Sequence, residues 1–170
     1  MTSKYLAQKT TLQHASARML NRYAPWMDYM LTITFGRNNL RLLPDEENAK
    51  KQVRHLSAAL NSAVWGHRSR KNEKCNVLCI PVFEGGTDIK RIHTHILLGN
   101  VKSDVEVRRF MQGYIPRSYW LAPDFDVRPV NMADGACWYL SKELNTINDA
   151  AIAWDIAAIP KPLRPRKSTT

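Results

Sequence analysis

Two histidines, His93 and His95, stand two residues apart in the apolar, β-branched run Arg91–Gly99. In a strand, side chains alternate faces and the chain rises about 3.3 Å per residue, so both imidazoles would point the same way from Cα atoms about 6.6 Å apart. Two imidazoles at that spacing can share one metal ion with only side-chain adjustment. The pair predicts a metal site on a strand, and the alternative is two partly exposed strand histidines.

Glu84 is the candidate third metal ligand. It ends a second strand-like run, residues 76–84, and a Gly-Gly turn separates that run from the histidines, which predicts a hairpin. If the hairpin pairs Glu84 with His93, and Val82 with His95, the carboxylate and both imidazoles share one face. Such a donor set suits Mg²⁺ or Mn²⁺ held in part by a substrate phosphate. The alternative for Glu84 is a solvated residue before the turn.

Tyr139 and Lys142 are the candidate catalytic pair. They lie three residues apart in a predicted helix over 133–144, so they share a helical face, offset from the apolar stripe of that helix. A phenol with a pKa of about 10 is a poor nucleophile at neutral pH. A lysine one turn away and a nearby divalent ion would both favour the phenolate. The alternative is a structural tyrosine.

The elements that must position these residues follow from periodicity and from turn residues. Their order, β-α-β-β-α-β with extra helices at both ends, predicts an α+β, ferredoxin-like split arrangement. Two helices would cover one face of an antiparallel sheet, and the other face would stay open and carry His93 and His95, with Thr94 on the covered side. The predicted strands are 26–35, 76–84, 89–98 and 125–130, and the predicted helices are 1–24, 44–66, 103–111, 133–144 and a weaker one from 145.

Composition predicts one globular domain over residues 1–170, with a core at about 26–145, a basic N-terminal helix and a flexible, basic, Pro-rich tail at about 158–170. The 44% hydrophobic and 24% charged content is ordinary for a globular protein. No apolar run approaches the ~20 residues of a membrane span. With no export signal, we expect a cytoplasmic protein whose three cysteines are reduced thiols.

A net charge of +10 predicts a polyanionic partner, with nucleic acid first. Basic residues cluster in the first 25 residues, in the tail and in the segment 68–71, although each cluster alone could be solvated surface charge. The candidate DNA-binding residues are Arg68, Arg70, Lys71 and Arg91. Candidate stacking surfaces, most of which we expect to pack in the core, are Trp26, Tyr29, Trp65, Tyr119, Trp120 and Trp138.

Three short motifs, taken in order, resemble those of the HUH endonucleases, most closely the single-tyrosine branch of rolling-circle replication initiators (Rep). The resemblance covers about residues 26–145, and it implies that His93, His95 and Glu84 bind Mg²⁺ or Mn²⁺. It also implies that Tyr139 is the nucleophile and that Lys142 contacts phosphate or the phenolate. Thr94 stands where the family usually has a bulky apolar residue, and Thr32 and Thr34 receive no specific role. The motifs are Thr32-Ile33-Thr34, Glu84 with His93-Thr94-His95, and Tyr139-Leu140-Ser141-Lys142.

The function implied by this resemblance is nicking and joining of single-stranded or hairpin DNA at an origin, through a 5′-phosphotyrosyl intermediate. Such an enzyme would initiate rolling-circle replication of a plasmid, phage or mobile element. The chain has no P-loop motif, so a separate helicase is expected as a partner. The alternatives are a single-tyrosine transposase or relaxase with the same chemistry, and a ferredoxin-like nucleic-acid-binding module that is not an enzyme.

Overall fold

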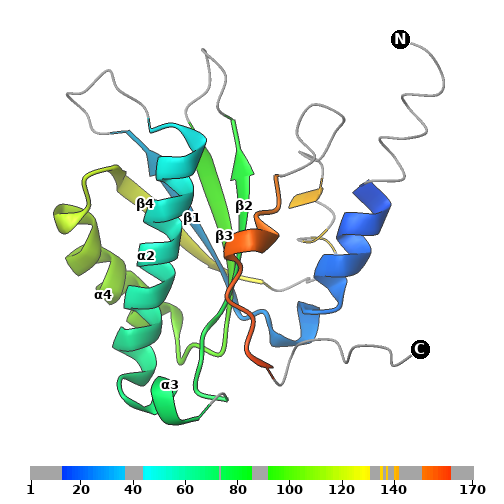
Figure 1. Ribbon diagram of the computed structural model, residues 1–170, viewed down its shortest axis with the longest axis horizontal. Helices are drawn as coiled ribbons and strands as arrows, with labels where there is room; N and C mark the ends of the chain where they lie inside the picture. Colours follow the sequence, from blue (N-terminus) through cyan, green and yellow to red (C-terminus); the bar gives the residue numbers. More distant parts are fainter. Residues whose placement is uncertain are drawn as a thin grey trace.

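The fold is built on a four-stranded antiparallel sheet (Figure 1). The computed structural model describes residues 13–36, 44–72, 74–85, 92–130, 135, 137, 140–141 and 151–161. The strands lie in the spatial order β2-β3-β1-β4, so β2 and β4 are the edges. This confirms an α+β protein with an antiparallel sheet. The strands are β1 (Tyr29–Phe35), β2 (Leu78–Glu84), β3 (His93–Gly99) and β4 (Leu121–Pro129).

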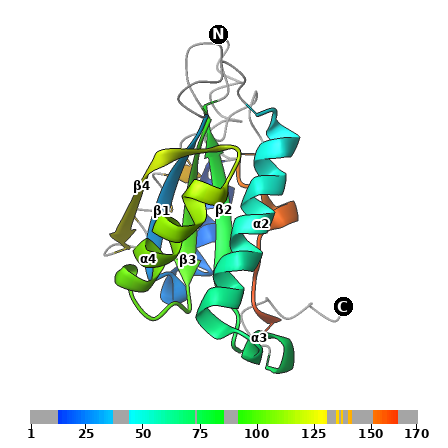
Figure 2. The ribbon, with the colours of Figure 1, turned by 90° about the vertical axis from the view of Figure 1, so that its left-hand side faces the viewer.

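Two helices, α2 (Glu46–Trp65) and α4 (Asp104–Tyr114), lie over one face of the sheet (Figures 1 and 2). Each begins at a side-chain cap, because the carboxylate of Asp45 and the hydroxyl of Ser103 accept hydrogen bonds from backbone N–H groups three residues on. The predicted apolar stripe of α2 is buried against β1, which confirms the helix and its inward face. The stripe is Ala49, Val53, Leu56, Leu60 and Val64, and its β1 partners are Leu31, Ile33 and Phe35.

The second face of the sheet carries a core of its own. Residues 13–21 are helical, and Leu20 from this helix packs in one cluster with Leu97 of β3 and Ile80 of β2. Cys137 and Leu140 join the same cluster. The prediction of an open second face is therefore wrong for this part of the sheet. Strand alternation places Leu97 on the same face as His95, and an apolar side chain there is stabilised by being covered.

A segment near the C-terminus covers the exposed edge of β2. Ile152 bridges Val82 and Ala158 bridges Cys79, with the single turn η3 (Trp154–Ile156) between them. The prediction of a helix in this region is wrong for the described residues 151–161, which are otherwise extended. An unpaired edge strand presents free backbone N–H and C=O groups, and the extended segment satisfies several of them.

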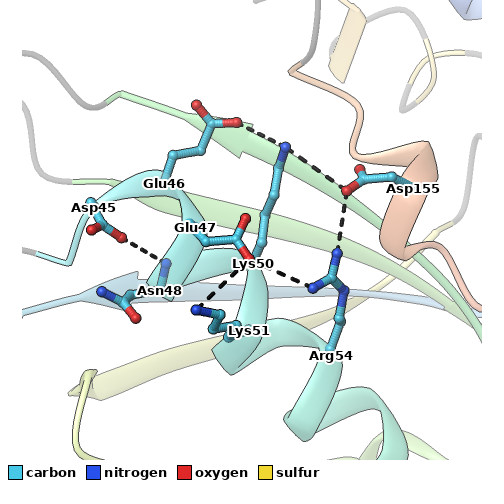
Figure 3. A network of polar contacts seen from close by, with 8 residues as sticks. All are labelled: Asp45, Glu46, Glu47, Asn48, Lys50, Lys51, Arg54 and Asp155. Carbon is cyan, nitrogen blue, oxygen red and sulfur yellow. Dashed lines mark hydrogen bonds and ion pairs between the residues drawn. The ribbon is translucent and has the colours of Figure 1, made fainter.

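Ion pairs connect this segment to α2 (Figure 3). The carboxylate of Asp155 lies 3.5 Å from Arg54 and 4.0 Å from Lys50, and Lys50 also lies 2.9 Å from Glu46. The hydrogen bond to Glu46 raises the pKa of Lys50. Exposed pairs of this kind contribute at most about 1 kcal/mol each, so they position the segment more than they stabilise the fold.

The starts of β1 and β4 differ from the sequence prediction by three and four residues. The chain before β1 forms the turn η1 (Ala24–Trp26), which follows from Pro25, so β1 begins at Tyr29 instead of residue 26. β4 begins at Leu121, four residues before its predicted start, and contains Pro123. Proline is tolerated on an edge strand because one side of that strand needs no ladder hydrogen bond.

Candidate functional site

The β2–β3 hairpin has the register on which the predicted shared face depends. Glu84 pairs with His93, and Val82 pairs with His95. Directly paired residues of antiparallel strands point to the same face, so Glu84 and both histidines share one side of the sheet. Thr94, between the histidines, points to the α2 and α4 side and is fully buried, also as predicted.

Two threonines of β1 hold the histidine rings. The hydroxyl of Thr34 lies 2.9 Å from Nδ1 of His93, and the hydroxyl of Thr32 lies 3.0 Å from Nδ1 of His95. Both contacts follow from the β1–β3 register, which pairs Thr34 with His93 and Thr32 with His95. We call these four residues together with Glu84 the His–Thr–Glu cluster.

The carboxylate of Glu84 meets one of the two imidazoles. Its Oε2 lies 3.2 Å from Nε2 of His95, and the two side chains are only 11% and 12% exposed. In this contact Nε2 of His95 donates a proton to the carboxylate. Because a threonine hydroxyl can donate or accept, Thr32 can donate to Nδ1 now and accept from Nδ1–H once Nε2 binds a cation. The cluster can therefore change tautomer without losing its ring support.

The cluster has the donor chemistry of a divalent-cation site, two imidazoles and one carboxylate on one face with supported Nδ1 atoms. Across the part of the chain that the structure describes, no group of three or more His, Cys, Asp and Glu side chains has its donor atoms gathered as in a loaded metal site. Here Glu84 instead contacts His95 directly. The residue types would suit Mg²⁺ or Mn²⁺, and Nε2 of His95 would have to lose its proton to hold the ion.

Three predicted site residues, Tyr139, Lys142 and Arg91, lie outside the described residues. Their neighbours Cys137 and Leu140 are helical and buried in the cluster that covers the histidine-bearing face of the sheet. Burial of Leu140 confirms that this side of the predicted helix faces inward.

The predicted basic segment 68–71 lies far from the cluster in the fold. It forms the short helix α3 (Arg68–Lys71), which follows the C-terminus of α2 at the end of the sheet where β2 begins (Figure 1). The cluster lies at the other end, where β2 ends and β3 begins; we call this the site end of the sheet. Arg68 and Lys71 are exposed on α3, at the opposite end from the site end, and are not brought together with the histidines.

The candidate stacking residues separate into two groups. Trp26 and Tyr119 are 42% and 52% exposed, so their rings face solvent. The other described members of the set, Tyr29, Trp65 and Trp120, pack against the main core as expected. Trp138 lies outside the described residues.

A second polar cluster, which the sequence did not indicate, lies between α2 and α4. The hydroxyl of Tyr114 lies 2.6 Å from Nδ1 of His55 and accepts a hydrogen bond from Gln52 at 2.8 Å. Burial raises the pKa of Tyr114 to about 12, and the bond from Gln52 opposes that shift only in part. The phenol therefore stays protonated at neutral pH, and its hydroxyl can donate to Nδ1 of His55 or accept from an N–H there. The tyrosine and the histidine lie 59 residues apart on two helices, and no local spacing could reveal the pair.

Comparison with known proteins returns no match: no family model, no curated protein and no solved structure is similar to this chain. In the described part of the chain, no helix has both the length and the apolar character needed to cross a bilayer.

Proposed function

We propose that this chain is a metal-dependent endonuclease of the HUH type, in the single-tyrosine rolling-circle initiator branch, that nicks and joins single-stranded DNA. The observation that carries the proposal is the register that places Glu84, His93 and His95 on one face, with a threonine on each histidine. The strand order and the two helices on one face also support a ferredoxin-like arrangement.

His93, His95 and Glu84 would hold Mg²⁺ or Mn²⁺. When bound, the ion supplies positive charge to the scissile phosphate and to the charge that develops on it in the transition state. Thr32 and Thr34 fix the two imidazole rings through Nδ1, so that Nε2 is the ligating atom. The low exposure of Glu84 and His95 strengthens every electrostatic interaction at this position, because little water screens it.

The covalent step that we propose is an in-line phosphoryl transfer. The phenol oxygen of Tyr139 forms a bond to phosphorus as it loses its proton, and the 3′ oxygen of the preceding nucleotide leaves and takes up a proton. The products are a 5′-phosphotyrosyl adduct and a free 3′-hydroxyl. A phosphodiester bond is exchanged for another ester, so a later attack by a 3′-hydroxyl can reseal the strand. Lys142 would favour the phenolate.

The substrate in this proposal is single-stranded or hairpin DNA at an origin, opened by a separate helicase. A single-tyrosine transposase or relaxase would use the same chemistry, but it would cleave a transposon end or a transfer origin instead of a replication origin. Sequencing the DNA fragment that remains attached to the protein distinguishes these roles, because a replication origin, a transposon end and a transfer origin have different neighbours.

The test is adduct formation with 5′- and 3′-labelled single-stranded oligonucleotides in Mn²⁺, separated on a denaturing gel. We expect the wild type to form a denaturant-resistant adduct, and EDTA to abolish it. The Tyr139→Phe variant should still bind the oligonucleotide but form no adduct. Tyr29→Phe is the matched control, since it also removes one phenol hydroxyl, at the end of β1 remote from the cluster.

Two outcomes would contradict the proposal. Reversible DNA binding with no adduct under any metal would indicate the nucleic-acid-binding module instead. An adduct that persists in Tyr139→Phe would show that another nucleophile acts, and peptide mapping of the adduct would then identify it.

A further inference from the structure

A cavity of about 570 Å³ opens between α2, the C-terminal end of α4 and the turn η2 (Ile115–Arg117). This volume lies within the range of small-molecule sites. The cavity lies on the α2 and α4 side of the sheet, so it is separate from the His–Thr–Glu cluster on the other side. The residues that carry the argument are His55, Arg109, Tyr114, Arg117 and Tyr119, and we call the site the arginine–tyrosine cavity.

The charge of this cavity is positive. Arg109 and Arg117 line it, and no aspartate or glutamate does. Within the described ranges neither arginine has an acidic partner, whereas the neighbouring Arg108 pairs with Asp104 at 3.5 Å. Two unpaired guanidinium groups at one cavity are suited to a phosphate, which they can bind through several N–H donors.

A third polar group comes from the Tyr114–His55 pair. The hydroxyl of Tyr114 lies 2.6 Å from Nδ1 of His55. When the phenol donates to Nδ1, the ring carries a proton on Nε2, and this N–H can join the two arginines as a donor because His55 is exposed.

Aromatic rings supply the other half of the cavity. The ring of Tyr114 is stacked between those of Phe110 and His55, with centroid distances of 5.2 and 5.7 Å. Tyr119 is 52% exposed and stands edge-on to Trp120 at 4.8 Å, which fixes its ring while leaving area for another ring. Phosphate donors beside an exposed aromatic ring are the combination that binds a nucleotide.

The cavity lies at the site end of the sheet. The backbone N–H of Gly36 donates to the carbonyl of Trp120 at 2.9 Å, and Gly36 is two residues beyond Thr34 of the His–Thr–Glu cluster. Leu121, the first residue of β4, pairs with Phe35, the last residue of β1. A strand of DNA leaving the cluster around this end of the sheet would therefore reach Tyr119 first and the arginines behind it.

We propose that the arginine–tyrosine cavity binds a nucleotide of single-stranded DNA that flanks the cleaved phosphate, with its phosphate on Arg109 and Arg117 and its base on Tyr119. This inference rests on the proposed function for the identity of the polymer. The binding itself requires no cleavage, so it can be measured in a background that cannot form an adduct.

The experiment measures fluorescence anisotropy of a labelled 20-nucleotide oligothymidylate in the Tyr139→Phe background, over a range of salt concentrations. We expect Arg109→Gln with Arg117→Gln to weaken binding about tenfold and to flatten the slope of log K against log salt by about 1, since each phosphate contact contributes about 0.7. Tyr119→Ala should weaken binding about tenfold through lost stacking. The control is Lys74→Gln with Lys102→Gln, which removes the same charge from two exposed lysines at the other end of the sheet and should cost less than threefold.

Equal losses in the two double variants would show diffuse electrostatic attraction and overturn the proposal. A second outcome would also overturn it: the Arg109 and Arg117 variant binds a free deoxynucleoside triphosphate more weakly than the wild type does, but binds the oligonucleotide equally well. The cavity would then be a site for free nucleotides. Photocrosslinking with 5-iododeoxyuridine gives an independent readout: we expect the crosslinked peptide to contain Tyr119, and a crosslink confined to Trp26 would contradict the site. If the cavity variants weaken binding but the wild type forms no adduct, this inference stands and the proposed enzyme function fails.

Discussion

A hydroxyl group contacts Nδ1 of a histidine at two places, in the His–Thr–Glu cluster on the strands and in the arginine–tyrosine cavity between α2 and α4, yet the two sites suit opposite charges. In the His–Thr–Glu cluster the rings of His93 and His95 share a face with a carboxylate, which suits a cation. In the arginine–tyrosine cavity the ring of His55 lies beside two unpaired arginines, which suits an anion. The same hydrogen bond thus supports two kinds of site, and the neighbouring charges decide which.

The hydroxyls of the two clusters also differ in kind. Thr32 and Thr34 are short side chains on a strand, and register alone places them against the histidines. Tyr114 reaches across from α4 to α2, where burial raises its pKa to about 12 and keeps it protonated. All three hydroxyls can donate to a ring nitrogen or accept from a ring N–H, so the difference lies in how each hydroxyl is positioned: by strand register for the threonines and by helix packing for the tyrosine.

The largest effect that would separate the two clusters is expected from His95→Ala or His93→Ala. Loss of a metal ligand should lower the rate of adduct formation by more than about a hundredfold without unfolding the chain. His67→Ala, which removes an exposed histidine beside α3, is the control and should leave the rate unchanged. Adduct rates within threefold of wild type in both ligand variants would show that these histidines hold no catalytic ion.

A smaller effect is expected from Thr32→Val and Thr34→Val, which keep the shape of the side chain and remove the hydroxyl on each histidine. We expect Mn²⁺ affinity, measured by isothermal titration, to fall ten- to hundredfold in each variant. Thr32→Ser and Thr34→Ser keep the hydroxyl and should retain most of the affinity. Unchanged Mn²⁺ affinity in the valine variants would mean that the threonines do not set the orientation of the rings.

A substitution at Thr94, the middle residue of the histidine motif, should stabilise the protein. Thr94 is fully buried on the helix side, and its hydroxyl has no hydrogen-bond partner among the residues described. Thr94→Val should therefore raise the free energy of unfolding by about 1 kcal/mol, because it removes a buried polar group that gains nothing. Thr94→Ser keeps the hydroxyl and loses a methyl group, so urea denaturation should show it destabilised by about 1 kcal/mol.

The last difference is confined to alkaline pH and concerns the pH dependence of stability. Burial raises the pKa of Tyr114 to about 12 from about 10, and raises the pKa of the Cys79 thiol to about 11 from about 9. Both groups favour the folded state while protonated, so their contribution is complete below about pH 9 and is lost as pH rises toward 12. In Tyr114→Phe, the free energy of unfolding should no longer fall above pH 10 through ionisation of the phenol. The fall caused by ionisation of Cys79 should remain. Urea unfolding at pH 8.5, 10 and 11 measures both parts, and an identical pH profile in the variant would contradict the role of Tyr114.

Sequence periodicity was sufficient for most of the elements that position the His–Thr–Glu cluster. The stripe of α2 and the alternation of β1 are local patterns, and both are confirmed. The register that pairs Glu84 with His93 was a condition of the prediction, because eight residues separate the two and local patterns alone allow other pairings. The role of Thr32 and Thr34 was missed, although their position on the polar face of a predicted strand was the available signal.

The covering of the second face could not be read from local patterns. The cluster on this face joins Leu20 to Cys137 and Ile152, which lie more than a hundred residues later in the chain, and each segment alone gives only a weak helical or strand signal. The extended run beside β2 was predicted as a helix, since edge pairing is a property of the assembled sheet and not of the segment.

By itself, the sequence determined which residues of a strand share a face, because side chains alternate with a period of two whatever the rest of the chain does. This placed the two imidazoles on one face before any fold was known, whereas the carboxylate of Glu84 joins them only because the hairpin pairs Glu84 with His93. Only the tertiary structure decided what lies beside them: the threonines from a strand some 60 residues earlier, and the second cluster, where α2 and α4 bring His55 to Tyr114. Such contacts depend on how elements pack against one another, and no spacing within one element encodes that.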